Sequence, residues 1–114
     1  MQNLLPKDWQ FDKTVLNDLA SQGLDTKDMW LIPPIVDLCA RLREPGHQSH
    51  GTLASEGRAA YENGILHVVL PPDTNPVLEN GSLLKGLREK AYADGKIHLH
   101  ILGALTAGLD GEKP

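Results

Sequence analysis

The sequence has one cysteine and no long apolar run, which exclude an internal disulfide and a membrane-spanning helix. Cys39 alone cannot form an internal disulfide, which is typical of a reducing compartment. No apolar run approaches the roughly 18–20 residues that a membrane-spanning helix needs, and the first residues carry no apolar signal segment. We therefore expect a cytoplasmic protein that does not contact a membrane.

Positive charge and aromatic residues are also scarce. The net charge is −4, with 11 Lys and Arg against 15 Asp and Glu. Nucleic-acid binding needs a local basic surface, and the densest basic group, within residues 85–96, is interrupted by Glu89. A nucleic-acid partner is therefore not expected. Aromatics make up 4% of the 114 residues, which favours one small helix-rich domain with a limited sheet over an all-β sandwich.

Familiar catalytic and cofactor motifs are missing as well. There is no G-x-S-x-G, no glycine-rich phosphate loop, no cysteine pair and no HExxH. Cys39 falls on the apolar stripe of a predicted helix, where we expect a buried, inert thiol. These absences predict a protein that is not an enzyme and that has no catalytic residues and no cofactor.

The first half of the chain is predicted to be helical over residues 12–46, after an N-terminal arm at 1–11. One helix is expected over about 12–22, with Gly23 as its left-handed stop. A second helix is expected to begin at Pro34, which fits the first helical position, and to end at Pro45-Gly46. Its apolar stripe comprises Ile35, Leu38, Cys39 and Leu42.

The second half contains an internal repeat. The segment AAYENGILHVVL (59–70) matches KAYADGKIHLHIL (90–102) at an offset of 31 residues. Each unit contains a hydroxyl cap, an amphipathic helix, a Gly stop at Gly64 or Gly95, and a short strand. The repeat reflects either a duplication or two similar helix-to-strand junctions. We predict two helix-strand units over 51–102 and a flexible tail over 103–114.

The two strands are expected at about 65–70 and 96–101. Because a helix joins them, parallel strands with a right-handed crossover are favoured, although antiparallel pairing stays open. One face should pack on the helices; it consists of Leu66, Val68, Leu70, Ile97, Leu99 and Ile101. The first strand is apolar on both faces, so we expect a second copy to complete or cover the sheet. The predicted fold is therefore α+β, in a homodimer.

Histidines provide the one candidate metal site. His98 and His100 share a strand face, and His67 is the repeat equivalent of His98. His47 and His50 are also at ligand spacing, in a loop. The alternatives to a metal site are a solvated strand face and an interface that responds to pH.

The segment MWLIPPI is an apolar cluster that serves either as core or as a partner-binding patch. We predict a non-enzymatic regulator that binds another protein, as an inhibitor or antiactivator masking the interface of a partner such as a transcription regulator. The alternative is a small metal-binding protein or enzyme that uses the histidines. The predicted partner or dimer interface comprises Trp9, Met29, Trp30, Ile32, Ile65, His67, Val69, His98 and His100.

Overall fold

The computed structural model describes residues 13–27 and 32–113, and the chain divides into two units, Met1–Pro33 and Pro34–Pro114. In the first unit, helix α1 spans Lys13–Ser21, close to the predicted range. Gly23 follows it with φ of 85°, so this glycine adopts the predicted left-handed conformation. The interface residues predicted at Trp9, Met29 and Trp30 lie outside the described residues.

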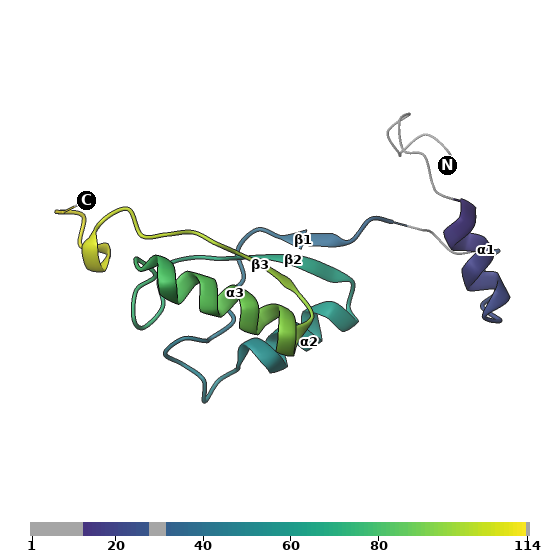
Figure 1. Ribbon diagram of the computed structural model, residues 1–114, viewed down its shortest axis with the longest axis horizontal. Helices are drawn as coiled ribbons and strands as arrows, with labels where there is room; N and C mark the ends of the chain where they lie inside the picture. Colours follow the sequence, from purple (N-terminus) through teal and green to yellow (C-terminus); the bar gives the residue numbers. More distant parts are fainter. Residues whose placement is uncertain (1–12, 28–31, 114) are drawn as a thin grey trace. The chain divides into compact units, whose positions relative to one another are not determined.

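The second unit is a parallel sheet with two crossover helices (Figure 1). Its elements in chain order are β1 (Ile35–Asp37), α2 (Leu53–Glu62), β2 (Ile65–Leu70), α3 (Gly81–Gly95), β3 (His98–Ile101) and a 3-10 turn (Ala107–Leu109). The strand order is β1-β2-β3, and both pairings are parallel. The predicted α+β class, the two helix-strand units and the parallel pairing are therefore confirmed.

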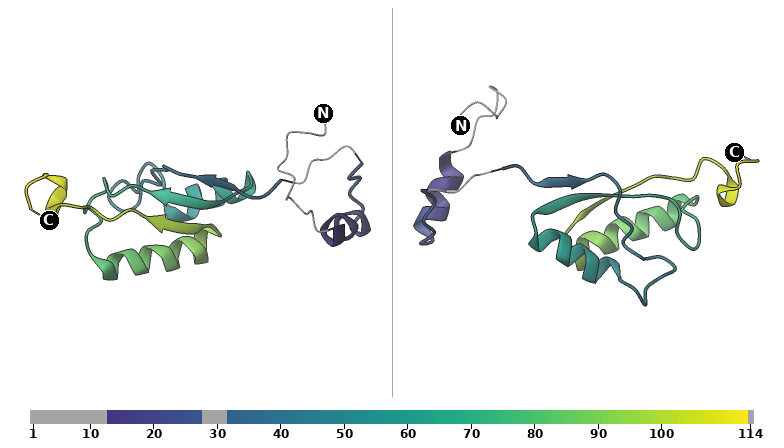
Figure 2. Two further views of the ribbon diagram at one scale, coloured as in Figure 1. Left: turned by 90° about the horizontal axis from the view of Figure 1, so that it is seen from above. Right: turned by 180° about the vertical axis from the view of Figure 1, so that it is seen from behind.

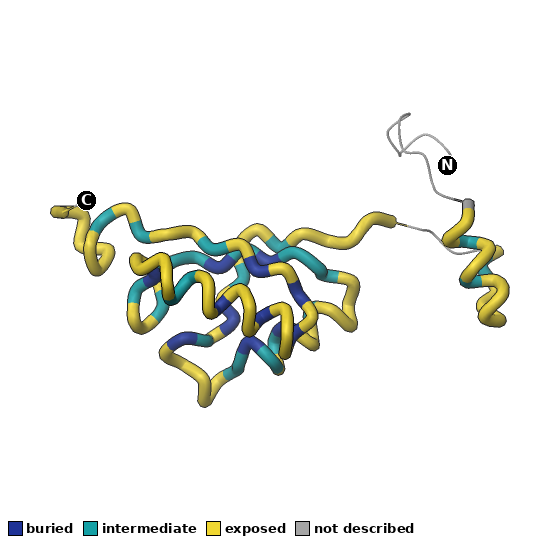
Figure 3. The backbone as a smooth tube through the Cα atoms, in the orientation of Figure 1, coloured by how far each residue is buried: buried dark blue, intermediate teal, exposed yellow. Residues whose placement is uncertain are grey.

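Helices α2 and α3 contact each other and lie on the same face of the sheet (Figure 2). The core forms between them and the strands, as the dark segments in Figure 3 show. The fully buried larger side chains are Leu53, Val68, Leu70, Leu78 and Ile97. Three of these five belong to the face that the sequence predicted to meet the helices. Leu78 was not predicted, because it lies in the proline-rich loop after β2.

The two helices approach closely at a pair of glycines. A Cβ built on Gly95 would lie 2.5 Å from the Leu53 carbonyl oxygen and 3.0 Å from the Gly57 Cα atom. Gly95 is the last residue of α3, as predicted, and the left-handed conformation falls on the next residue, Lys96, with φ of 63°. A glycine is needed at position 95 because a side chain there would push the helices apart.

The helix predicted to begin at Pro34 is not formed. Ile35–Asp37 is strand β1, and its first amide, on Ile35, donates to the Gly64 carbonyl oxygen at 2.9 Å. After the strand, Asp37 Oδ1 accepts the Cys39 N–H at 2.9 Å, and this hydrogen bond turns the chain. Arg43 has a φ of 65°, which is incompatible with a continuous right-handed helix. The structure of this segment is determined by strand pairing with β2, which cannot be predicted from local hydrophobic periodicity. Cys39 is consequently exposed, not buried.

The structure bears only partly on the expectations about a membrane, a dimer and a protein partner. No helix within the described residues is long and apolar enough to cross a membrane. The homodimer and the binding of another protein stay predictions.

Candidate functional site

The carboxyl ends of the three strands lie at one edge of the sheet, because the strands are parallel. Residues 38–51 follow β1, residues 71–80 follow β2, and residues 102–107 follow β3. We call these three segments the carboxyl-end surface. In parallel α/β sheets, ligands bind at this edge, where loops carry the functional side chains.

An ion pair joins the first two segments of the carboxyl-end surface. Arg41 donates through Nε and Nη2 to the same oxygen, Asp73 Oδ2, and both distances are 2.8 Å. The hydrogen bond to Asp73, and then the charge of that carboxylate, raise the pKa of the Arg41 guanidinium above its ordinary value. Because both side chains are about half exposed, at 54% and 41%, the pair fixes loop geometry more than it stabilises the fold.

The same two loops also meet through their backbones. A Cβ on Gly46, which has a φ of 103°, would lie 2.5 Å from the Asn75 carbonyl oxygen, so only glycine permits this approach. The Asn75 amide donates to the Pro45 carbonyl oxygen at 3.4 Å. The peptide bonds Glu44–Pro45 and Asn75–Pro76 are both cis.

Glu44 ties the loop after β1 to the start of α2. Its Oε2 accepts the Leu53 N–H at 2.7 Å, which satisfies one of the free amides of the first helical turn. Arg43, next to it, is exposed, and its guanidinium has no hydrogen bond or ion pair with any residue that the structure describes. Arg43 is therefore a cation at the carboxyl-end surface that is available to a ligand.

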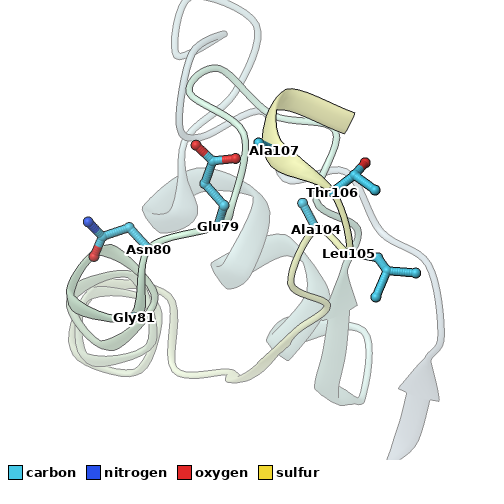
Figure 4. Close-up of a pocket in the computed structure, with 7 residues that line it drawn as sticks. All are labelled: Glu79, Asn80, Gly81, Ala104, Leu105, Thr106 and Ala107. Atoms are coloured by element: carbon cyan, nitrogen blue, oxygen red, sulfur yellow. The ribbon is translucent and has the colours of Figure 1, made fainter. Parts of the chain in front are cut away.

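A shallow cavity of about 600 Å³ lies between the loop before α3 and the segment after β3 (Figure 4). Its lining residues are Glu79, Asn80, Gly81, Ala104, Leu105, Thr106 and Ala107. The polar groups here are already paired: Glu79 Oε2 accepts the Gly108 N–H at 2.9 Å, and Asn80 Oδ1 accepts the Ser82 N–H at 2.9 Å. The one charged group is a carboxylate, so the cavity does not suit an anion.

The three strand histidines gather on the face of the sheet opposite the helices. His67 pairs with His98 in the strand register, and their rings stack with centroids 5.0 Å apart. His67 Nδ1 lies 3.1 Å from His100 Nε2. His67 and His98, which the internal repeat makes equivalent, are therefore neighbours on paired strands. Across the described residues, however, no group of three or more His, Cys, Asp or Glu side chains is arranged to hold a metal ion.

The remaining predicted interface residues are dispersed. Val69 is half-buried on the histidine face, whereas Ile65 packs against the core. Ile32 is 56% exposed and belongs to the first unit. His47 and His50 stack in the loop after β1, with ring centroids 6.3 Å apart.

Comparison with known proteins gives a consistent answer. No protein family model matches the chain. A dihydroorotase of Ruminiclostridium cellulolyticum is 33% identical over 98 residues, which is 86% of this chain and 23% of that protein. A dihydroorotase of Desulforapulum autotrophicum is 38% identical over 79% of this chain and 22% of its own length. A dihydroorotase-like protein of Pseudomonas putida is 35% identical over 82% of this chain and 22% of its own length.

The chain is similar to dihydroorotases. It spans about a fifth of the length of the dihydroorotases and dihydroorotase-like proteins that it matches. These relatives overturn two predictions made from the sequence. The prediction of a regulator, inhibitor or antiactivator is wrong, and so is the prediction that the protein is not an enzyme, because several of the relatives carry the name of an enzyme, dihydroorotase. The lack of a familiar catalytic motif therefore does not exclude an enzyme.

Sequence reasoning missed the residues of the carboxyl-end surface, Arg41, Arg43 and Asp73. Both arginines fall within the helix that was predicted to end at Pro45-Gly46. One signal was available, because two β-branched residues, Ile35 and Val36, follow a Pro-Pro pair and precede a turn-forming Asp37. This order is typical of a short strand that ends in a turn.

Proposed function

We propose that the chain is part of a dihydroorotase-like enzyme that acts on dihydroorotate, and that the carboxyl-end surface contributes to its substrate site. The observation that carries this proposal is the similarity to dihydroorotases, at 30–38% identity over most of the chain. Because this chain spans about a fifth of those relatives, the activity and the substrate of a whole enzyme are part of the proposal.

The topology supports the same proposal. In a sheet of order β1-β2-β3, both crossover helices lie on one face, so the chain winds in one direction without a reversal. Repetition of such units is how a (β/α) barrel is built, and a barrel enzyme carries its active site at the carboxyl ends of the strands. A doubly wound sheet would place helices on both faces.

Arg43 is the side chain that we propose for substrate recognition. Dihydroorotate, the compound that the relatives' name denotes, is a carboxylate, and an arginine fork binds a carboxylate through two parallel hydrogen bonds. Arg41 is already paired with Asp73, whereas Arg43 has no partner among the described residues. Arg41 and Asp73 then hold the loop in position, and Arg43 receives the ligand.

The test is the consumption of dihydroorotate by the purified enzyme that contains the chain and by its matched arginine variants. We expect Arg43→Ala to lower kcat/KM at least about tenfold, which corresponds to the loss of one charge-assisted hydrogen bond. Arg43→Lys should recover part of the lost kcat/KM, because lysine keeps the positive charge but cannot form the two parallel hydrogen bonds of a guanidinium. The control is Arg88→Ala, an exposed arginine on α3, which should leave kcat/KM unchanged.

Two outcomes contradict the proposal. The first is that the enzyme of which this chain is part does not consume dihydroorotate. The second is that Arg43→Ala and Arg88→Ala have the same kcat/KM, which would mean that the carboxyl-end surface does not contribute to the substrate site.

We also propose that the protein is cytoplasmic. The single cysteine, exposed in the loop after β1, is a usage typical of a reducing compartment and supports this location. Cell fractionation with an antibody against the chain tests it, and recovery in a secreted or membrane fraction would contradict it.

A further inference from the structure

The face of the sheet that the helices leave uncovered carries a cluster of imidazoles. His67 comes from β2, and His98 and His100 come from β3. In the parallel register His67 pairs with His98 and Val69 with His100, so the His67 ring lies against both other rings. The ring centroids are 5.0 Å apart for His67 and His98 and 5.3 Å apart for His67 and His100.

One pair of nitrogen atoms in this cluster has the separation of two ligands on one metal. His67 Nδ1 and His100 Nε2 are 3.1 Å apart. Two imidazole nitrogens that each lie about 2.0–2.1 Å from a metal ion, at bond angles of ~95–110°, are themselves ~3.0–3.4 Å apart. Without a metal, the same two atoms share one proton in a hydrogen bond, which only one ring can donate.

We propose that His67 and His100 form a two-imidazole site for a divalent transition-metal ion on the histidine face of the sheet. Both ligands belong to paired strands, so the backbone fixes their spacing in the metal-free protein. His98 stacks on His67 and positions that ring, and Tyr92 packs on His98 with ring centroids 5.3 Å apart. His98 and His100 are exposed, which leaves the remaining coordination positions to water.

The donor set determines which ions bind. Imidazole nitrogen suits Cu²⁺, Ni²⁺ and Zn²⁺, whereas Mg²⁺ and Ca²⁺ require oxygen ligands. None of the described carboxylates forms an ion pair or hydrogen bond with the three histidines, so the site offers imidazole nitrogen and no oxygen ligand from a side chain. We therefore expect affinity in the order Cu²⁺ above Ni²⁺ and Zn²⁺, with no measurable Mg²⁺ binding.

This site is separate from the carboxyl-end surface, and its test does not use dihydroorotate, so its failure and the failure of the proposed function are distinguishable. The experiment is a calorimetric titration of the full chain with Cu²⁺, Zn²⁺ and Mg²⁺ in a buffer that does not bind metals. We expect one Cu²⁺ per chain. His100→Ala and His67→Ala should each weaken Cu²⁺ binding at least tenfold, because each removes one of two ligands.

The matched control is the double variant His47→Ala and His50→Ala, which removes the other histidine pair of the chain. It should leave Cu²⁺ affinity within twofold. The natural protein, but not His100→Ala, should also melt at a higher temperature with Cu²⁺ than without it. Circular dichroism verifies that each variant folds; His100 is exposed, so its removal leaves the core intact.

In a second readout, paramagnetic Cu²⁺ should broaden the ring signals of His67, His98 and His100 before those of His47 and His50. The proposal is overturned if Cu²⁺ does not bind, if the His47 and His50 variant abolishes binding, or if His100→Ala binds Cu²⁺ as tightly as the natural protein.

Discussion

Two glycines, Gly57 and Gly95, determine how closely α2 and α3 approach. A Cβ on Gly57 would lie 2.8 Å from the Gly95 Cα atom, and both contacts involve backbone, which cannot move aside as a flexible side chain can. Helix propensity alone would favour alanine at both positions. Tertiary contact therefore overrides local preference at these two residues, and the helices gain a close fit over the sheet.

The first prediction compares two glycines of the same helix. Gly95→Ala should destabilise the protein by about 1–3 kcal/mol, because the added methyl group overpacks the contact with α2. Gly86→Ala should stabilise it by about 0.5–1 kcal/mol, because nothing lies within 4 Å of a Cβ there and alanine restricts the unfolded chain. Urea denaturation followed by circular dichroism measures both. Equal effects of the same sign would refute the close helix contact.

At the scale of elements, the start of α2 is determined by a capping box. Thr52 accepts the Ser55 N–H through its hydroxyl at 3.0 Å, and Ser55 Oγ accepts the Thr52 N–H at 2.9 Å. The reciprocal pair satisfies two amides that the first helical turn leaves free. This is the hydroxyl cap that the repeat pattern predicted for the first helix-strand unit.

The second prediction follows from this cap. Thr52→Ala should lower the free energy of unfolding by about 1 kcal/mol, because one amide of the first turn loses its partner. Ser49→Ala is the control: Ser49 is exposed in the preceding turn and should change stability by less than ~0.5 kcal/mol. If denaturation midpoints of the two variants coincide, the hydroxyl does not cap α2.

The elements divide clearly into those that the sequence predicts and those that it does not. The helix-strand units were predictable, because caps, helical periodicity and a change to period two all agree within each unit. Strand β1 was not, because the apolar positions at Ile35, Leu38, Cys39 and Leu42 imitate a helical stripe. Pairing with β2, which is distant in sequence, determines the structure of this segment, and it outweighs the helical stripe.

At the scale of the whole second unit, the sheet is covered on one face only. The buried side chains face α2 and α3, whereas Val36 is 50% exposed and His98 and His100 are exposed on the other side. Parallel sheets are normally covered on both faces. A singly wound sheet with a free face is the arrangement that further strands complete in a barrel, which agrees with relatives more than four times as long as the matched segment.

The central claim is that dihydroorotate binds at the carboxyl-end surface of a dihydroorotase-like fold. Backbone amide chemical shifts, recorded as dihydroorotate is added to the isotope-labelled protein, test the ligand and its location together. We predict shifts in residues 38–44 and 73–79, with Gly64 and Lys96 at the opposite edge of the sheet unaffected. The absence of shifts up to about 1 mM, the upper end of common KM values, or shifts confined to the opposite edge would contradict the claim.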